Sequence, residues 1–176
     1  MDPMMDNYRL LARYNTWFNA CLFDACERLD DAARKAPRGA FFGSIHATLN
    51  HLLWGDAMWL GRFAAQGEGS DTLPADLLAL PAGARYETEL HADWAALRAH
   101  RVRLDAVIEA WLAALPADFP QRTMRYSNTK GVQREHPMWQ ALTHFFNHQT
   151  HHRGQITTLL MQAGVDVGVT DLIALV

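Results

Sequence analysis

The chain has 176 residues, and its 16 Lys and Arg against 19 Asp and Glu give a formal net charge of −3. A hydrophobic content of 49% suits one buried core, so we expect a single domain over residues 1–176. The basic residues are spread thinly among acidic ones, which disfavours nucleic acid as a partner. No apolar run reaches the roughly 18 residues of a membrane-spanning helix, and no secretory pattern opens the chain, so we expect a cytoplasmic protein with no membrane partner.

The first half of the chain carries two helical patterns. Apolar residues at steps of three and four predict a helix over residues 3–30 and a second over residues 42–65. Ser44 is a suitable N-cap if the second helix begins slightly later. Residues 66–85 are rich in Gly, Pro, Ala and Asp and are too many for a tight turn. They therefore indicate a long crossover connection.

The second half repeats the helical pattern twice. A third helix is expected over residues 85–115, and a fourth over residues 137–164, which ends at a glycine. Between them, residues 119–137 favour a small hairpin or an ordered loop around an Asn/Gly turn. Residues 170–176 can add a final helical turn. Four amphipathic helices with almost no strand signal predict an all-α four-helix bundle.

Histidines gather in the fourth helix, where four of them fall within nine positions: His144, His148, His151 and His152. His148 and His152 are one turn apart, so their imidazoles can converge on one ion. Imidazole is a common ligand of zinc, copper, nickel and iron. Apolar residues on the same side of this helix indicate that the pair faces the core, where an unpartnered polar ring is costly to bury. The pair therefore predicts a metal site that needs at least one more ligand.

The neighbouring residues exclude two known metal sites. A zincin helix needs a glutamate as general base, and this chain has Gln149 at that position. No Glu is followed three residues later by His, which excludes a carboxylate-bridged di-metal bundle. A mononuclear histidine site remains, and His51 in the apolar stretch of the second helix is the best third ligand. His144 is an alternative partner for His148, in which case His152 would support the ligands. His151 is expected at the rim, at a dimer surface or beside a hydrogen-bond partner.

Two segments carry a resemblance to a known family. They are Leu49-Asn50-His51-Leu52-Leu53-Trp54-Gly55-Asp56 and Asn147-His148-Gln149-Thr150-His151-His152-Arg153-Gly154-Gln155. Together with Tyr14-Asn15-Thr16-Trp17-Phe18-Asn19, they resemble the DinB/YfiT-like family of metal-dependent proteins, which is distinct from the DNA polymerase of the same name. The resemblance implies an up-down-down-up four-helix bundle, a homodimer and one divalent metal ion. Matched residue by residue, the implied ligands are His51, His148 and His152.

Four further residues are candidates for supporting the ligands or lining a substrate pocket: Asp56, His144, Arg153 and Gln155. Asp56 lies on the apolar side of its helix, where it either orients a ligand histidine or pairs with an arginine. Arg153 and Gln155 belong to the matched motif, but bundle or dimer salt bridges and a helix hydrogen bond account for them equally well. The role of His144 depends on which pair ligates.

Three protein ligands leave one coordination position open, which is typical of a catalytic site. Some relatives in the family transfer a low-molecular-weight thiol, so the resemblance implies a metal-dependent enzyme that moves such a thiol to an electrophilic substrate. Metal-assisted hydrolysis is the second reaction to consider. The alternative outside enzymes is a non-catalytic metal-binding or stress-related helical dimer. Three imidazoles suit zinc, nickel or iron, and the sequence does not choose among them.

Overall fold

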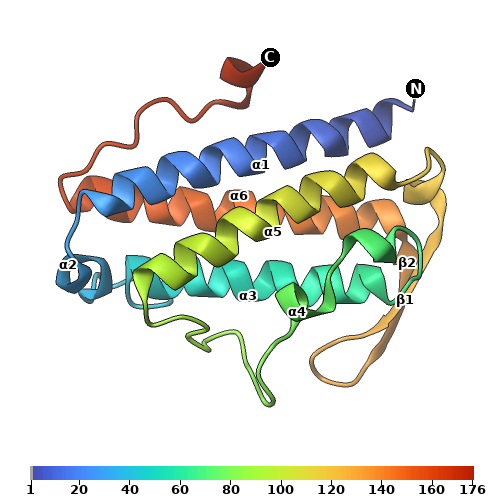
Figure 1. The fold of residues 1–176 in the computed structure, drawn as a ribbon, viewed down its shortest axis with the longest axis horizontal. Coiled ribbons are helices and arrows are strands. Elements are labelled where there is room, and N and C mark those ends of the chain that lie inside the picture. Colours follow the sequence, from blue (N-terminus) through green and yellow to red (C-terminus); the bar gives the residue numbers. More distant parts are fainter. Residues whose placement is uncertain (1) are drawn as a thin grey trace.

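Four long helices dominate the structure, a computed structural model that describes residues 2–176. They are α1 (Pro3–Glu27), α3 (Ile45–Ala64), α5 (Trp94–Ala114) and α6 (Met138–Gln162). α3 and α5 run in one direction, and α1 and α6 run in the other (Figure 1). This is the expected up-down-down-up path, and the connection between α3 and α5 has to travel the length of the bundle.

Short elements fill the connections. The helices α2 (Asp31–Lys35) and α4 (Ala75–Leu78) follow α1 and α3, and single 3₁₀ turns span Ser70–Thr72, Phe119–Gln121 and Leu172–Leu175. The expected turn in the C-terminal tail is therefore present. The tail lies along α1, where the hydroxyl of Tyr14 donates to the carbonyl oxygen of Thr170 at 2.6 Å (Figure 1).

Capping residues fix where the helices begin. The side chain of Ser44 accepts from the backbone N–H of Ala47, so α3 begins at Ile45, three residues after the apolar pattern suggests. Asp93 caps α5 in the same way by accepting from Ala96 at 2.8 Å. An N-cap side chain satisfies a backbone donor that has no partner inside the helix.

The expectation that the third helix begins at residue 85 is wrong, because α5 begins at Trp94. The amide of Asn50 holds the preceding segment by accepting from the N–H of His91 and donating to its carbonyl oxygen. The ring of buried His46 contacts the same carbonyl oxygen at 2.8 Å. These bonds replace the helical hydrogen bonds of His91, so residues 85–93 cross the face of α3 as an irregular segment.

The region before α6 is a two-stranded antiparallel sheet, so the chain is mostly helical but not all-α. Strands β1 (Thr123–Ser127) and β2 (Gln133–Pro137) pair with Tyr126 opposite Arg134. The turn is built on Asn128, whose side chain accepts from two backbone N–H groups, and on Gly131, whose φ of +76° favours glycine. Of the two structures expected here, the hairpin is confirmed.

The core lies between the four long helices. α1 packs against α5 and α6, and α3 packs against α6. Large side chains fill the space; the ring of Phe63 stacks on Trp111 with 4.9 Å between centroids, and both are fully buried. Burial of such aromatic side chains is the main source of stability in a bundle of this size.

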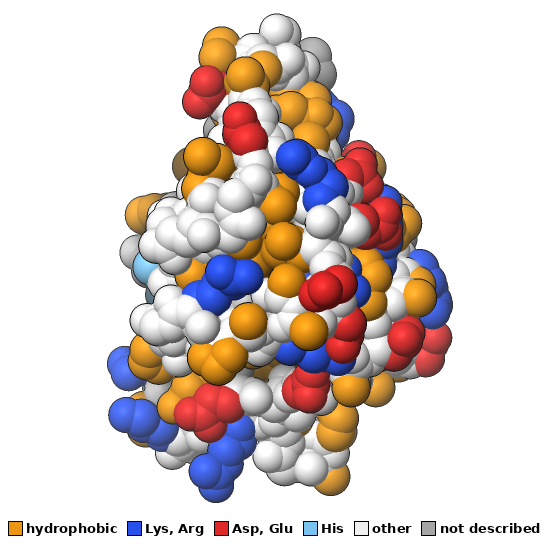
Figure 2. Space-filling view, turned by 90° about the vertical axis from the view of Figure 1, so that its left-hand side faces the viewer, with side chains coloured by type: hydrophobic (Ala, Val, Ile, Leu, Met, Phe, Trp, Pro, Cys, Tyr) orange, Lys and Arg blue, Asp and Glu red, His pale blue; other side chains and the backbone are white. Residues whose placement is uncertain are grey.

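The surface carries both signs of charge. Figure 2 shows acidic and basic side chains interspersed with apolar ones on the end of the molecule where α2 lies. At this end Arg98 of α5 forms ion pairs with Asp24 and Glu27 of α1. Within residues 2–176, the structure contains no helix that is long and apolar enough to cross a membrane.

Candidate metal centre

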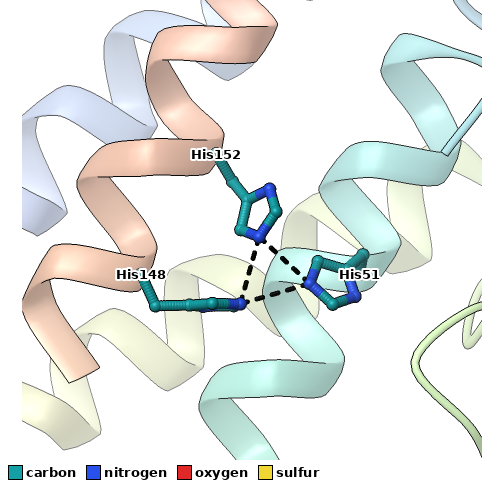
Figure 3. A group of neighbouring side chains, drawn as sticks. All are labelled: His51, His148 and His152. Carbon is teal, nitrogen blue, oxygen red and sulfur yellow. Dashed lines mark hydrogen bonds between the residues drawn. The ribbon is translucent and has the colours of Figure 1, made fainter. Parts of the chain in front are cut away.

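Three imidazoles from two helices meet at one point. His51 projects from α3, and His148 and His152 project from α6, as Figure 3 shows. Their Nε2 atoms form a triangle with sides of 3.1 to 3.2 Å. We call these residues the three-histidine group. It is the only cluster of three or more His, Cys, Asp or Glu within the described chain whose ligand atoms lie close enough to hold a metal ion.

The hydrogen bonds on the far side of two rings place their protons. Nδ1 of His51 lies 2.8 Å from the carbonyl oxygen of Tyr86, which can only accept, so Nδ1 carries the proton. Nδ1 of His152 donates to Oε1 of Gln155, also at 2.8 Å. The Nε2 atoms of His51 and His152 therefore both present lone pairs, and no proton bridges the 3.1 Å between them.

The ring of His148 is positioned by the shape of α3. A Cβ on Gly55 would lie 2.7 Å from Cε1 of His148, closer than real Cβ contacts occur. Glycine at this position lets the imidazole lie directly against the backbone of α3. A smaller gap between α3 and α6 brings the ring within reach of His51, so Gly55 determines where the third nitrogen sits.

The three rings are neutral at pH 7. Burial lowers the pKa of His148 to about 3 and that of His152 to about 4, with smaller contributions from the neighbouring imidazoles. Burial also lowers the pKa of His51. Metal binding requires the neutral form of imidazole, so these shifts keep all three rings ready to bind an ion.

The arrangement fits a divalent ion. Ligand nitrogens about 2.0–2.1 Å from a tetrahedral ion lie about 3.3–3.4 Å apart, close to the sides of this triangle. Without an ion, the lone pairs of His51 and His152 face each other in a buried place with no donor between them, which is unfavourable. The three-histidine group could therefore hold a metal ion. The Nδ1 bonds of His51 and His152 to Tyr86 and Gln155 are those that metal-ligating histidines usually make.

Two cavities reach the three-histidine group from different sides. The His148 cavity, of about 660 Å³, is lined by residues of α3, α6, the hairpin and the end of the crossover, and His148 is part of its wall. The His152 cavity, of about 390 Å³, is lined by His51, His152 and Gln155. Tyr86 lines both cavities. Small molecules can therefore approach the Nε2 triangle from two directions.

The four supporting residues expected from the sequence take different places. Gln155 holds His152, and His144 is exposed in the wall of the His148 cavity, with its ring 4.9 Å from that of Trp59. Asp56 pairs with Arg101 at 2.6 Å and does not contact a ligand histidine. Arg153 donates to the side chain of Asn15 in the core. The exposed ring of His151 lies beside His152 in the wall of the His152 cavity, outside the Nε2 triangle.

Asp56 and Arg153 belong to a separate group, which we call the buried polar network. Its members come from α1, α3, α5 and α6 and are at most 3% exposed: Asn15, Asn19, Asp56, Arg101, Asp105 and Arg153. Arg101 joins both carboxylates at 2.6 Å. Asn15 and Asn19 donate to Asp105. Burial raises the pKa of Asp105 to about 6, although the guanidinium of Arg101 opposes the shift.

Comparison with known proteins places the chain in a family. The family model described as the DinB family matches residues 4–175. The chain belongs to the DinB family. A curated relative, "Protein DinB" of Bacillus subtilis (strain 168), is 27% identical over 162 residues, which cover 92% of this chain and 88% of the relative. No solved structure matches the chain.

Three features of this DinB-family site are not predicted by the sequence. The carbonyl of Tyr86 and the close approach at Gly55 depend on how the crossover and α6 pack on α3. The sequence also gives no indication that Arg62 lines the His148 cavity. Gly55 lies inside the motif that carries the resemblance, so its position beside His51 was a usable signal. The other two had no local signal, because a backbone carbonyl and a lone arginine look the same in any sequence.

Proposed function

We propose that the chain is a metal-dependent enzyme in which His51, His148 and His152 hold one divalent ion, either zinc, nickel or iron. In this proposal the enzyme activates a low-molecular-weight thiol for transfer to an electrophilic substrate. The observation that carries the proposal is the triangle of Nε2 atoms between two cavities. Three protein ligands keep a coordination position open, which is typical of catalytic rather than structural sites.

A bound divalent ion lowers the pKa of a coordinating thiol, so that the thiol is deprotonated at neutral pH. His51 and His152 contribute by keeping their protons on Nδ1, through Tyr86 and Gln155, which leaves Nε2 free. The thiol sulfur forms a carbon–sulfur bond with the substrate. The leaving group departs with the electron pair of the bond that breaks, and the thiol proton passes to solvent.

Two features of the site favour thiol transfer over metal-assisted hydrolysis. Hydrolytic metal sites commonly use a carboxylate as general base, and no Asp or Glu is found among the described residues that line either cavity. A thiol that loses its proton on binding has less need of such a base. Transfer also requires two molecules at one centre, and the two cavities provide two approaches.

The first test is metal content, measured by mass spectrometry on protein purified without an affinity tag. We expect close to one equivalent of a divalent metal in the wild type and loss of metal in His51→Ala and His148→Ala. His151→Ala is the matched control, because His151 lies next to His152 on α6 but outside the triangle. A folded wild type that takes up no zinc, nickel or iron, or equal metal loss in His151→Ala, would contradict the proposal.

The second test addresses the thiol. Protein loaded with Co²⁺ is titrated with cysteine and, as a control, with serine, and the near-ultraviolet spectrum is recorded. We expect a sulfur-to-cobalt charge-transfer band with cysteine alone. Absence of the band in Co²⁺-loaded protein would remove thiol activation and leave a non-catalytic metal-binding helical dimer as the better account. The dimer is checked separately by light scattering of the eluting protein.

A further inference from the structure

The His148 cavity has aromatic walls and a cationic end. The rings of Trp54, Trp59 and Tyr126 contribute to its lining, with His148 at one side. Trp54 and Trp59 are each only 7% exposed, so both rings are largely enclosed by neighbouring residues. Flat apolar walls of this kind bind flat apolar molecules, and the few polar groups among them decide orientation.

Arg62 is one of two arginines that line this cavity. Its guanidinium lies 4.7 Å from the ring centroids of both Trp59 and Tyr126. None of the ion pairs formed within residues 2–176 includes Arg62. Its half-buried position lowers its pKa through desolvation. A guanidinium that packs on two aromatic rings, with its N–H donors not taken up by a carboxylate, is well suited to bind an anion.

The charges around the cavity reinforce this preference. Arg85 lines the same cavity, and no Asp or Glu does so in the described part of the chain. A neutral ligand gains nothing from two cations, whereas an anion is attracted by both. Because Arg62 lies half-buried and Arg85 is exposed, Arg62 is the group that would contact the anion most directly.

The helix sets the length of the molecule that would fit. Gly55 contacts the ring of His148, and Arg62 follows it by seven residues on α3. Seven residues of α-helix rise about 10.5 Å, so Arg62 and Gly55, against which the ring of His148 lies, are about two turns apart along α3. A bicyclic aromatic ring with one carboxylate has about this length.

We propose that the His148 cavity binds a small organic carboxylate with a flat apolar body, with the carboxylate on Arg62 and the other end toward His148. This proposal rests on the function proposed above, because the end that faces His148 is the end that would react. It adds to that function the chemical class of the electrophilic substrate. Trp59 and Tyr126 would then serve twice, by packing on the apolar body and by holding the guanidinium.

The test compares two probes of one shape, naphthalene-2-carboxylate and neutral naphthalene-2-carboxamide, on the zinc-loaded full chain. Binding is followed by calorimetry and by quenching of tryptophan fluorescence. We expect the carboxylate to bind the wild type on the order of tenfold tighter than the amide, the effect of a charge-assisted hydrogen bond. Equal binding of the two probes, or no binding of the carboxylate, would overturn the proposal.

Variants assign the preference to one residue. Arg62→Gln is expected to bind both probes equally, and Arg62→Lys to recover part of the preference. Arg13→Gln is the matched control, because it removes one charge from an exposed position on α1. Its binding is expected to equal that of the wild type. A carboxylate preference that survives in folded Arg62→Gln, or that is lost in Arg13→Gln, would overturn the proposal.

The same measurements on protein stripped of metal separate this proposal from the proposed function. If the wild type takes up no metal, the proposed function fails, while an Arg62-dependent preference for the carboxylate in the stripped protein still supports the anion site. If stripping the metal abolishes the preference and Arg62→Gln does not, the metal binds the carboxylate. That result overturns the assignment to Arg62 and leaves metal binding intact.

Discussion

The three-histidine group and the buried polar network are both sets of polar side chains inside one bundle, but they differ in how their polar atoms are partnered. In the network, each carboxylate meets the guanidinium of Arg101, and Asn15 and Asn19 donate to Asp105. In the three-histidine group, His51 and His152 turn lone pairs toward each other, and their donors point away. The network pairs its opposite charges within the protein, although single atoms such as Oδ1 of Asp56 and Nε of Arg153 have no hydrogen-bond partner. The three-histidine group instead directs lone pairs at one another with no positive charge among them.

The difference teaches how buried polarity can be interpreted. Polar groups that pair with one another across helices fix how those helices pack, and they need no ligand. A binding site is indicated when several polar side chains each have one hydrogen-bonded atom and direct a second atom, which has no donor, toward a common point. By this criterion Asp56, which lies in the resembling motif, belongs to the structural set, although it lies only five residues from His51.

The largest expected effect comes from breaking the network. Asp56→Ala leaves Arg101 buried with one carboxylate fewer, and removing one partner of a buried pair typically costs about 3–5 kcal/mol of unfolding free energy. Urea denaturation at pH 7 measures the loss, with the exposed Asp71→Ala as a control close to the wild type. Molecules that remain folded should still bind metal. A loss under 1 kcal/mol would show that the network is not the structural element described here.

A substitution at Gly55 tests whether the position of the His148 ring matters for metal binding when all three histidines are kept. Gly55→Ala places a methyl group against the ring of His148 and is expected to lower metal affinity on the order of a hundredfold with all three histidines present. Gly61→Ala is the matched control, because a Cβ at Gly61 meets nothing within 4 Å. It should leave affinity unchanged and stabilise α3 by about 0.5–1 kcal/mol. Competition with a chromogenic chelator gives the affinities. Equal affinity in both variants would contradict the close packing at Gly55.

Removing the bond that places the proton on His152 should have a smaller effect. Gln155→Ala is expected to reduce metal affinity by about ten- to hundredfold, the usual range for residues that orient a ligand. Gln140→Ala, at an exposed position of the same helix, serves as the control. The unfolding free energy of metal-free protein should change little in either variant. An unchanged affinity in Gln155→Ala would mean that His152 is held by packing alone.

The last comparison concerns pH and needs no metal. His148 and His152 have folded-state pKa values of about 3 and about 4, below the ordinary 6.5, so the unfolded chain binds more protons between these limits. The stability of metal-free protein should therefore fall as pH drops from 6.5 toward 4. His148→Ala should flatten this dependence, and Gln140→Ala, which removes no titratable group from α6, should not. Urea titrations at several pH values test it, and identical slopes in the three proteins would refute the burial of His148.

Much of the architecture follows from local patterns. Apolar residues at steps of three and four predict all four long helices. Ser44 marks the start of α3, and the four-residue spacing of His148 and His152 brings both rings to one face of α6. The sequence does not predict the start of α5, because the apolar residues before Trp94 belong to a segment whose backbone is hydrogen-bonded to α3 and is not helical. Asn50, 41 residues away in sequence, takes the hydrogen bonds of His91. No local pattern carries that information.

The site was only partly predictable for the same reason. His51 could be chosen because it is the sole histidine at the centre of an apolar helix, and the helical spacing supplied the other pair. The assignment of Asp56 stayed open between two partners because Arg101 lies 45 residues away. Gly55 and Tyr86 act through backbone position, and the identity of a side chain does not report where its backbone packs.

The main chain and the side chain of residue 86 have separate roles, because only the main-chain carbonyl oxygen bonds His51. The acceptor is a main-chain oxygen, which any amino acid at position 86 would provide. The side chain at that position lines both cavities. Substitutions at Tyr86 can therefore alter which molecules are admitted while the protonation of His51 is preserved. Within a lineage of such proteins, chemistry can be held constant by the main chain at the same residue whose side chain is free to explore new substrates.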